Sequence, residues 1–117
     1  MNQEEQMVLC GSSAYTKKYY LNEDFEGLPA NIKDELKIMC VLYTEDIGGV
    51  LTLVFDENGN LKLQTSCDEG DLLYDDIGSV LKVKQLQRTK QELLESLELY
   101  YKIFFLGEEL TEEDLED

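Results

Sequence analysis

Residues 50–65 constrain the fold most, because both their strands and their turn predict a β-hairpin. Val50–Phe55 is apolar at every position except Thr52, which is typical of a strand in the middle of a sheet. Asn58 and Gly59 favour the positive φ values that a type I′ turn requires. Leu61–Thr65 then alternates apolar and polar residues. The sequence therefore predicts a hairpin whose first strand is central.

The residues before this hairpin predict a helix. Pro29 suits the first helical position, and Gly48 and Gly49 end the segment. Between them, apolar residues recur at steps of three and four, which places them on one helical face. This face consists of Leu28, Ile32, Leu36, Met39, Cys40 and Tyr43.

A second helical pattern ends at Gly107, and its start has two interpretations. An N-cap at Ser79 would give one long or kinked helix, which we favour. Thr89–Glu92 also has the form of a capping box, which would leave Val80–Leu86 as a further strand. The anchoring apolar residues are Leu86, Leu93, Leu97, Tyr100 and Phe104.

The N-terminal part completes the expected sheet. Met7–Cys10 and Thr16–Leu21 are predicted strands on either side of a loop at 11–13, and residues 22–27 form an acidic connector. The order β-β-α-β-β-α predicts an α+β fold, with an antiparallel sheet of about four strands and two helices packed on one face. We expect one domain over residues 1–107 and an acidic C-terminal tail at 108–117, which holds seven of the 26 acidic residues.

Charge limits the function classes. The 26 acidic residues oppose 10 basic ones, giving a net charge of -16 over 117 residues. Such a surface repels nucleic acid and anionic membranes and favours basic protein surfaces. We therefore expect no direct nucleic-acid binding. We also expect no membrane association, since no segment has the ~18 consecutive apolar residues of a membrane span.

The cysteines favour a cytoplasmic protein without thiol catalysis. Cys10, Cys40 and Cys67 are odd in number and form no CxxC pair, so free thiols are expected. Residues 1–6 do not resemble a secretion signal. Cys10 precedes the expected loop at 11–13, but the chain has no histidine to activate it. We therefore predict a structural role for that loop and a core position for Cys40.

The densest acidic segment is residues 68–76. Oxygen clusters of this kind bind Mg²⁺ or Ca²⁺, but the spacing matches no known metal loop, and we favour a solvated loop that binds a protein partner. Asp56–Asn60 starts like a calcium loop, yet Leu61 and Cys67 replace the glycine and glutamate which that loop needs. No cofactor or metal is predicted. The predicted partner-binding residues are Asp68, Glu69, Asp71, Asp75 and Asp76.

A basic run follows the acidic segment. It holds four of the 10 basic residues, and we expect it to contact the protein's own acidic residues or a second copy. The run comprises Lys82, Lys84, Arg88 and Lys90. Tyr100 and Tyr101 follow at helical spacing and are expected in the core rather than on a ligand.

Four short segments carry a family resemblance: Ile38–Gly49, Leu97–Lys102, Lys18–Tyr20 and Asp68–Asp71. With them the chain resembles an uncharacterised family of short acidic proteins from anaerobic clostridia, over most of residues 7–107. The resemblance implies a bacterial cytosolic protein. It lends no catalytic residue, because the family has no assigned activity.

Three functional hypotheses follow. The favoured one is a non-enzymatic interaction or regulatory module that forms a homodimer or binds a protein with a basic surface. The second is a nucleic-acid mimic that inhibits a DNA- or RNA-binding protein, which requires carboxylates spaced like phosphates. The third is a divalent-metal-dependent enzyme that uses the carboxylates of residues 68–76.

Overall fold

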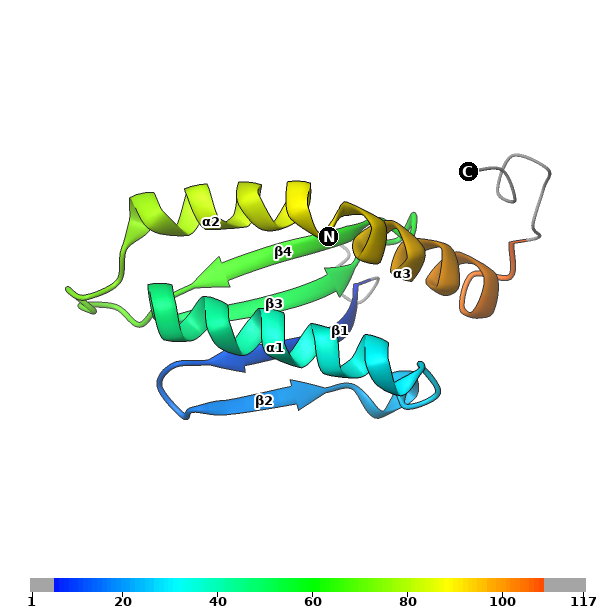
Figure 1. Ribbon diagram of the computed structural model, residues 1–117, viewed down its shortest axis with the longest axis horizontal. Coiled ribbons are helices and arrows are strands. Elements are labelled where there is room, and N and C mark those ends of the chain that lie inside the picture. The colour runs from blue at the N-terminus through cyan, green and yellow to red at the C-terminus, as the bar shows by residue number, and fades with distance from the viewer. Residues whose placement is uncertain (1–5, 109–117) are drawn as a thin grey trace.

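The computed structural model describes residues 6–108 as a four-stranded antiparallel sheet with three α-helices (Figure 1). The prediction of an α+β fold with such a sheet is confirmed. The strand order is β2-β1-β3-β4, so β3 is central, as its apolar sequence predicts. The predicted tail lies outside the described residues except for Glu108. The strands are β1 (Met7–Ser13), β2 (Lys18–Leu21), β3 (Val50–Phe55) and β4 (Leu61–Ser66).

The helices are α1 (Ala30–Ile47), α2 (Asp76–Thr89) and α3 (Gln91–Phe104), with a short 3-10 turn η2 (Glu23–Phe25) before α1. Pro29 immediately precedes the first residue of α1. Its C-cap Gly48 has φ 92°, a conformation that glycine adopts without steric cost. The predicted glycine stop of this helix is confirmed.

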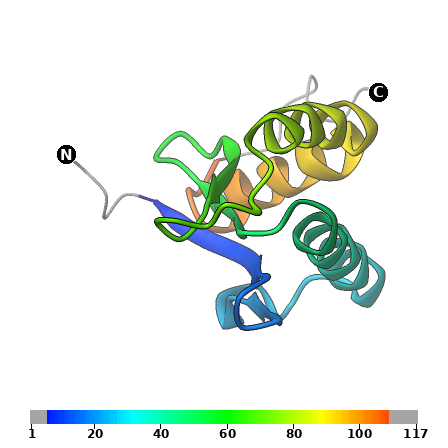
Figure 2. The same ribbon diagram turned by 90° about the vertical axis from the view of Figure 1, so that its left-hand side faces the viewer.

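One face of the sheet forms the core. Cys10 and Ser12 of β1 lie opposite Leu53 and Leu51 of β3, and paired residues share a face. Ser12 Oγ donates to the Cys40 carbonyl oxygen of α1 at 2.7 Å. Phe55 follows on the same face of β3 and stacks on Tyr101 of α3. Figure 2 shows α1 and α3 on one side of the strands.

The N-terminal hairpin differs from the prediction. Residues 11–13 continue β1 instead of forming a loop, and the turn lies at residues 14–17. A Cβ atom at Gly11 would lie 2.8 Å from the Leu51 carbonyl oxygen, so glycine permits β1 to approach β3 closely. The Ser12 hydroxyl bonds to α1 instead of the turn. Strand β2 accordingly begins at Lys18 rather than Thr16.

The β3–β4 hairpin is confirmed, but its turn is not type I′. Gly59 has φ 86°, whereas Asn58 does not have a positive φ. Asp56 Oδ1 accepts hydrogen bonds from the amides of Asn58 and Asn60, each at 2.9 Å. This carboxylate organises a five-residue connection at 56–60 in place of a two-residue turn.

The C-terminal helical pattern is divided into two helices at Lys90. The strand alternative for Val80–Leu86 is wrong, since these residues belong to α2. Asp75, not Ser79, caps this helix, and its Oδ1 accepts from the Gly78 amide at 2.8 Å. The Thr89 hydroxyl donates to the Gln85 carbonyl oxygen instead of capping α3.

Candidate functional site

The predicted acidic segment connects β4 to α2 at one end of the molecule (left in Figure 1). Asp68, Glu69, Asp75 and Asp76 are exposed, and Asp71 is half-buried. The segment thus brings the five predicted carboxylates to one end of the fold. The chain turns tightly here, since the Asp71 amide donates to the Asp68 carbonyl oxygen at 3.1 Å.

Tyr15 attaches this segment to the turn between β1 and β2. Its hydroxyl donates to Asp71 Oδ2 at 2.5 Å and accepts from the Asp68 amide at 2.8 Å. The hydrogen bond to Asp71 raises the pKa of Tyr15 above its usual value, because ionised tyrosine would repel the carboxylate. Two of the predicted site residues therefore also hold the loop in place.

Two kinds of catalytic group are relevant to this segment, a bound metal ion and a reactive thiol. Within residues 6–108, no three His, Cys, Asp or Glu side chains are grouped so as to hold a metal ion. The exposed thiol of Cys67 lies beside the segment. Local desolvation and the charges of Asp76, Asp71 and Asp68 raise the pKa of this thiol. It therefore stays protonated and is a poor nucleophile at neutral pH.

Large apolar side chains lie among these carboxylates, which sequence reasoning missed. We call them the apolar patch: Leu72, Leu73, Ile77, Val80 and Leu81, with exposed fractions of 94%, 92%, 77%, 56% and 63%. Ile77 and Leu81 are one helical turn apart and therefore share a side of α2. The sequence held one sign of this exposure, because neither Ile77 nor Leu81 has the helical spacing that would place it on the same face as the core residue Leu86.

Polar contacts attach α2 to the rest of the fold. Ser79 is buried, and its hydroxyl lies 2.7 Å from the Tyr43 hydroxyl and 2.8 Å from that of Tyr74. Two residues of the basic run pair with carboxylates of α1: Lys82 with Asp46 at 3.7 Å and Lys90 with Glu35 at 3.1 Å.

The basic run does not pair with the acidic segment. None of the four ion pairs among residues 6–108 joins the two. Lys84 and Arg88 of the run take part in none of those pairs. The run therefore makes intramolecular contacts through Lys82 and Lys90, and it leaves the acidic segment available at the other end of α2.

The remaining candidates belong to the core. Cys10 and Cys40 are fully buried with their Sγ atoms 3.9 Å apart. The Cys10 thiol and burial both raise the pKa of Cys40. Cys10 lies on a strand rather than beside a loop, closed to solvent. Tyr101 is buried as predicted, and Tyr100 is partly buried against Phe104, with ring centroids 4.8 Å apart. Phe104 itself is 70% exposed, so its predicted place among the anchoring core residues is wrong.

Comparison with known proteins identifies a family without a known activity. Residues 6–109 match a family of unknown function, DUF6145. No curated protein and no solved structure matches the chain. None of the helices within residues 6–108 has the length and apolar character needed to cross a membrane. Since the match spans most of the sequence, the chain belongs to the DUF6145 family.

Proposed function

We propose that this protein is a non-enzymatic interaction module that binds a protein partner through the acidic segment and the apolar patch. The observation that carries the proposal is the exposure of five large apolar side chains within ten residues, 72–81. Exposed apolar clusters rimmed by polar residues are typical of protein interaction sites.

The charges define the kind of partner. Asp68, Glu69 and Asp76 are exposed on either side of Leu72 and Leu73 in the sequence. The complementary surface is apolar at its centre and carries lysine or arginine at its edge. Attraction between these carboxylates and the partner's basic residues would accelerate association of the two proteins, and the apolar contacts would slow dissociation.

A second copy of this chain fits this surface less well. Two copies would each bring a net charge of -16, and like charges oppose association. The nucleic-acid mimic receives no specific support, because exposed carboxylates lie on α1, on the β3–β4 turn and on α3 as well as in the acidic segment. We assign the protein to the bacterial cytoplasm, a proposal supported by three cysteines that form no disulfide.

The test is capture from a clostridial lysate with paired variants. Leu73→Ser and Ile77→Ser remove apolar patch residues that the fold does not bury. Ile38→Ser is the matched control, since Ile38 is 57% exposed on α1 outside the patch. We expect one set of proteins to be retained by the wild type and the control but lost by both patch variants.

Salt dependence separates the two parts of the surface. Raising ionic strength screens exposed charges, with a Debye length of about 8 Å at physiological salt. We therefore expect added salt to weaken the retention of partner proteins by the wild type. We also expect Asp68→Asn to retain these proteins less well than the wild type does. Equal retention by the wild type, Leu73→Ser and Ile77→Ser would contradict the proposal.

A further inference from the structure

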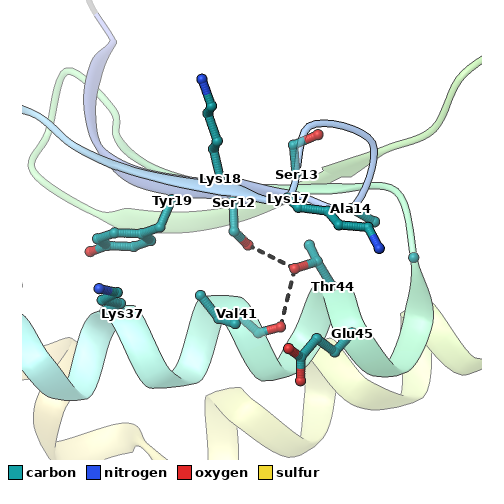
Figure 3. Close-up of a pocket in the computed structure, with 11 residues that line it drawn as sticks. Ser12, Ser13, Ala14, Lys17, Lys18, Tyr19, Lys37, Val41, Thr44 and Glu45 are labelled. Atoms are coloured by element: carbon teal, nitrogen blue, oxygen red, sulfur yellow. Dashed lines mark hydrogen bonds between the residues drawn. The ribbon is translucent and has the colours of Figure 1, made fainter.

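A groove lies between α1 and the β1–β2 hairpin, and none of its lining residues belongs to the apolar patch. Its volume is about 740 Å³, within the range of small-molecule sites. Figure 3 shows the hydroxyls of Ser12 and Thr44 at its centre, between strand and helix. The Thr44 hydroxyl lies 3.2 Å from Ser12 Oγ and 3.1 Å from the Val41 carbonyl oxygen. Val41 and Ala14 add an apolar lining.

The groove is basic in a strongly acidic protein. Lys17, Lys18 and Lys37 line it, and Glu45 is its one acidic lining residue. None of these lysines belongs to the four ion pairs among residues 6–108. The Lys18 side chain points away from α1 in Figure 3, whereas Lys37 lies on the side of α1 that faces the strands. Unpaired ammonium groups at a concave surface attract anions.

Two local features are unfavourable for the fold alone. Lys17 has φ 57°, the only positive φ of a non-glycine residue within 6–108. Tyr19 Oη is buried and is the one buried side-chain N or O atom without a hydrogen-bond partner in the same range. Strained backbone and unsatisfied polar groups concentrate at functional sites.

Tyr19 is suited to donate a hydrogen bond. Burial raises the pKa of its hydroxyl, and the neighbouring Cys10 thiol raises it further. The group therefore remains protonated at neutral pH and can donate to an acceptor. In Figure 3 the Tyr19 hydroxyl and the Lys37 ammonium lie on the same side of the view, Tyr19 on the strand and Lys37 on α1.

We propose that this groove binds a small organic anion, whose carboxylate or phosphate group accepts hydrogen bonds from Lys37 Nζ and Tyr19 Oη. The remainder of the ligand lies against Val41 and Ala14, toward Lys17 at the other end. This site shares no residue with the proposed protein-binding surface, and the two proposals are tested by different experiments.

The experiment is an amide NMR titration of the full chain with succinate and with glycerol 3-phosphate, against sodium chloride at matched ionic strength. We expect saturable shifts at the groove residues with at least one probe, and the two probes distinguish carboxylate from phosphate. Lys37→Met should weaken binding by about tenfold, which is typical of losing a charge-assisted hydrogen bond. Lys18→Met is the matched control and should change binding by less than about twofold.

Stability measurements separate a binding role from a structural one. Tyr19→Phe should weaken binding about three- to tenfold while its melting temperature stays equal to that of the wild type or rises. Lys17→Gly should also keep or raise the melting temperature, because glycine adopts positive φ without strain. The proposal is overturned by the absence of saturable shifts with both probes up to about 10 mM. Equal weakening by Lys18→Met and Lys37→Met, or a Tyr19→Phe variant that loses stability but binds normally, would also overturn it.

Discussion

Helices α2 and α3 each have 14 residues and follow one another along the chain, yet they contribute differently to the fold. Helix α3 buries Leu93, Leu94, Leu97 and Tyr101. Helix α2 buries only Ser79 and Leu86, and three of its large apolar residues remain exposed. One helix therefore forms the core, and the other presents side chains to solvent.

Aromatic side chains form much of the contact between α3 and the rest of the core. The Tyr101 ring lies parallel to Phe55, with centroids 4.2 Å apart and planes 2° apart. Phe25 stacks on Phe105, just after α3, at 4.7 Å. Buried aromatic pairs of this kind contribute beyond their buried area. Helix α2 contributes Leu86 to the core and is otherwise attached by the Ser79 hydroxyl contacts and the Lys82–Asp46 ion pair, with the Lys90–Glu35 pair at its C-cap.

The largest expected effect comes from removing the aromatic ring of α3. Tyr101→Ala leaves a cavity beside Phe55 and should lower the free energy of unfolding by about 3–5 kcal/mol. Leu81→Ala in α2 should change it by less than about 0.5 kcal/mol, as expected of an exposed residue. Urea denaturation of both variants measures this difference in the free energy of unfolding. Equal losses in the two variants would contradict the contrast between the helices.

The next effect concerns the polar attachment of α2. Ser79→Ala leaves the Tyr43 and Tyr74 hydroxyls without this partner and should lower the free energy of unfolding by about 1–3 kcal/mol. Ser96→Ala is the matched control in α3, because Ser96 is exposed and bonds only its own helix. Thermal denaturation should show a clear loss for Ser79→Ala alone, and a loss of the same size in both would argue against this attachment.

A smaller effect is expected at the start of α2. Asp75→Ala removes the cap of the Gly78 amide and should lower the free energy of unfolding by about 1 kcal/mol. Asp75→Asn retains a capping oxygen and should recover most of the loss. Amide exchange at residues 76–80 measures the fraying directly, and unchanged exchange in Asp75→Ala would show that the cap is dispensable.

The smallest effect is a pH dependence beside α3. Partial desolvation acts to raise the pKa of Asp56, but the hydrogen bonds from Asn60 and Asn58 outweigh it and hold the pKa below its usual value. A lowered native pKa means stabilisation that is present above about pH 4 and lost as the pH falls through the native pKa. The melting temperatures of the wild type and Asp56→Ala should therefore converge in acid, and a constant difference would contradict this.

Local signals in the sequence predicted most of the fold. The apolar residues of β3 and those spaced along one face of α1 indicate buried elements, and residues that end such elements follow each of them. The central strand and the helix could therefore be predicted. The Asn58–Gly59 turn type was missed because the Asp56 carboxylate overrides the dipeptide preference. The Gly11 position was missed because its reason, the close approach to Leu51, is a contact between distant residues.

The candidate sites were less predictable. The acidic residues of 68–76 were visible as a charge cluster, but exposure of Leu72, Leu73 and Ile77 depends on where α2 lies in the fold. A helical pattern shows which residues share a face and not whether another element covers it. The groove beside Lys37 is assembled from strand and helix residues far apart in the chain, so no local motif marks it.

Native-state hydrogen exchange tests the contrast between the two helices most directly. Core elements exchange through global unfolding, and weakly packed elements exchange through smaller openings. We predict that amides of Leu97–Tyr101 in α3 report the global free energy of unfolding and that amides of Val80–Lys84 in α2 report a value at least about 2 kcal/mol lower. Equal protection in the two helices would contradict the assignment of α3 to the core and α2 to recognition.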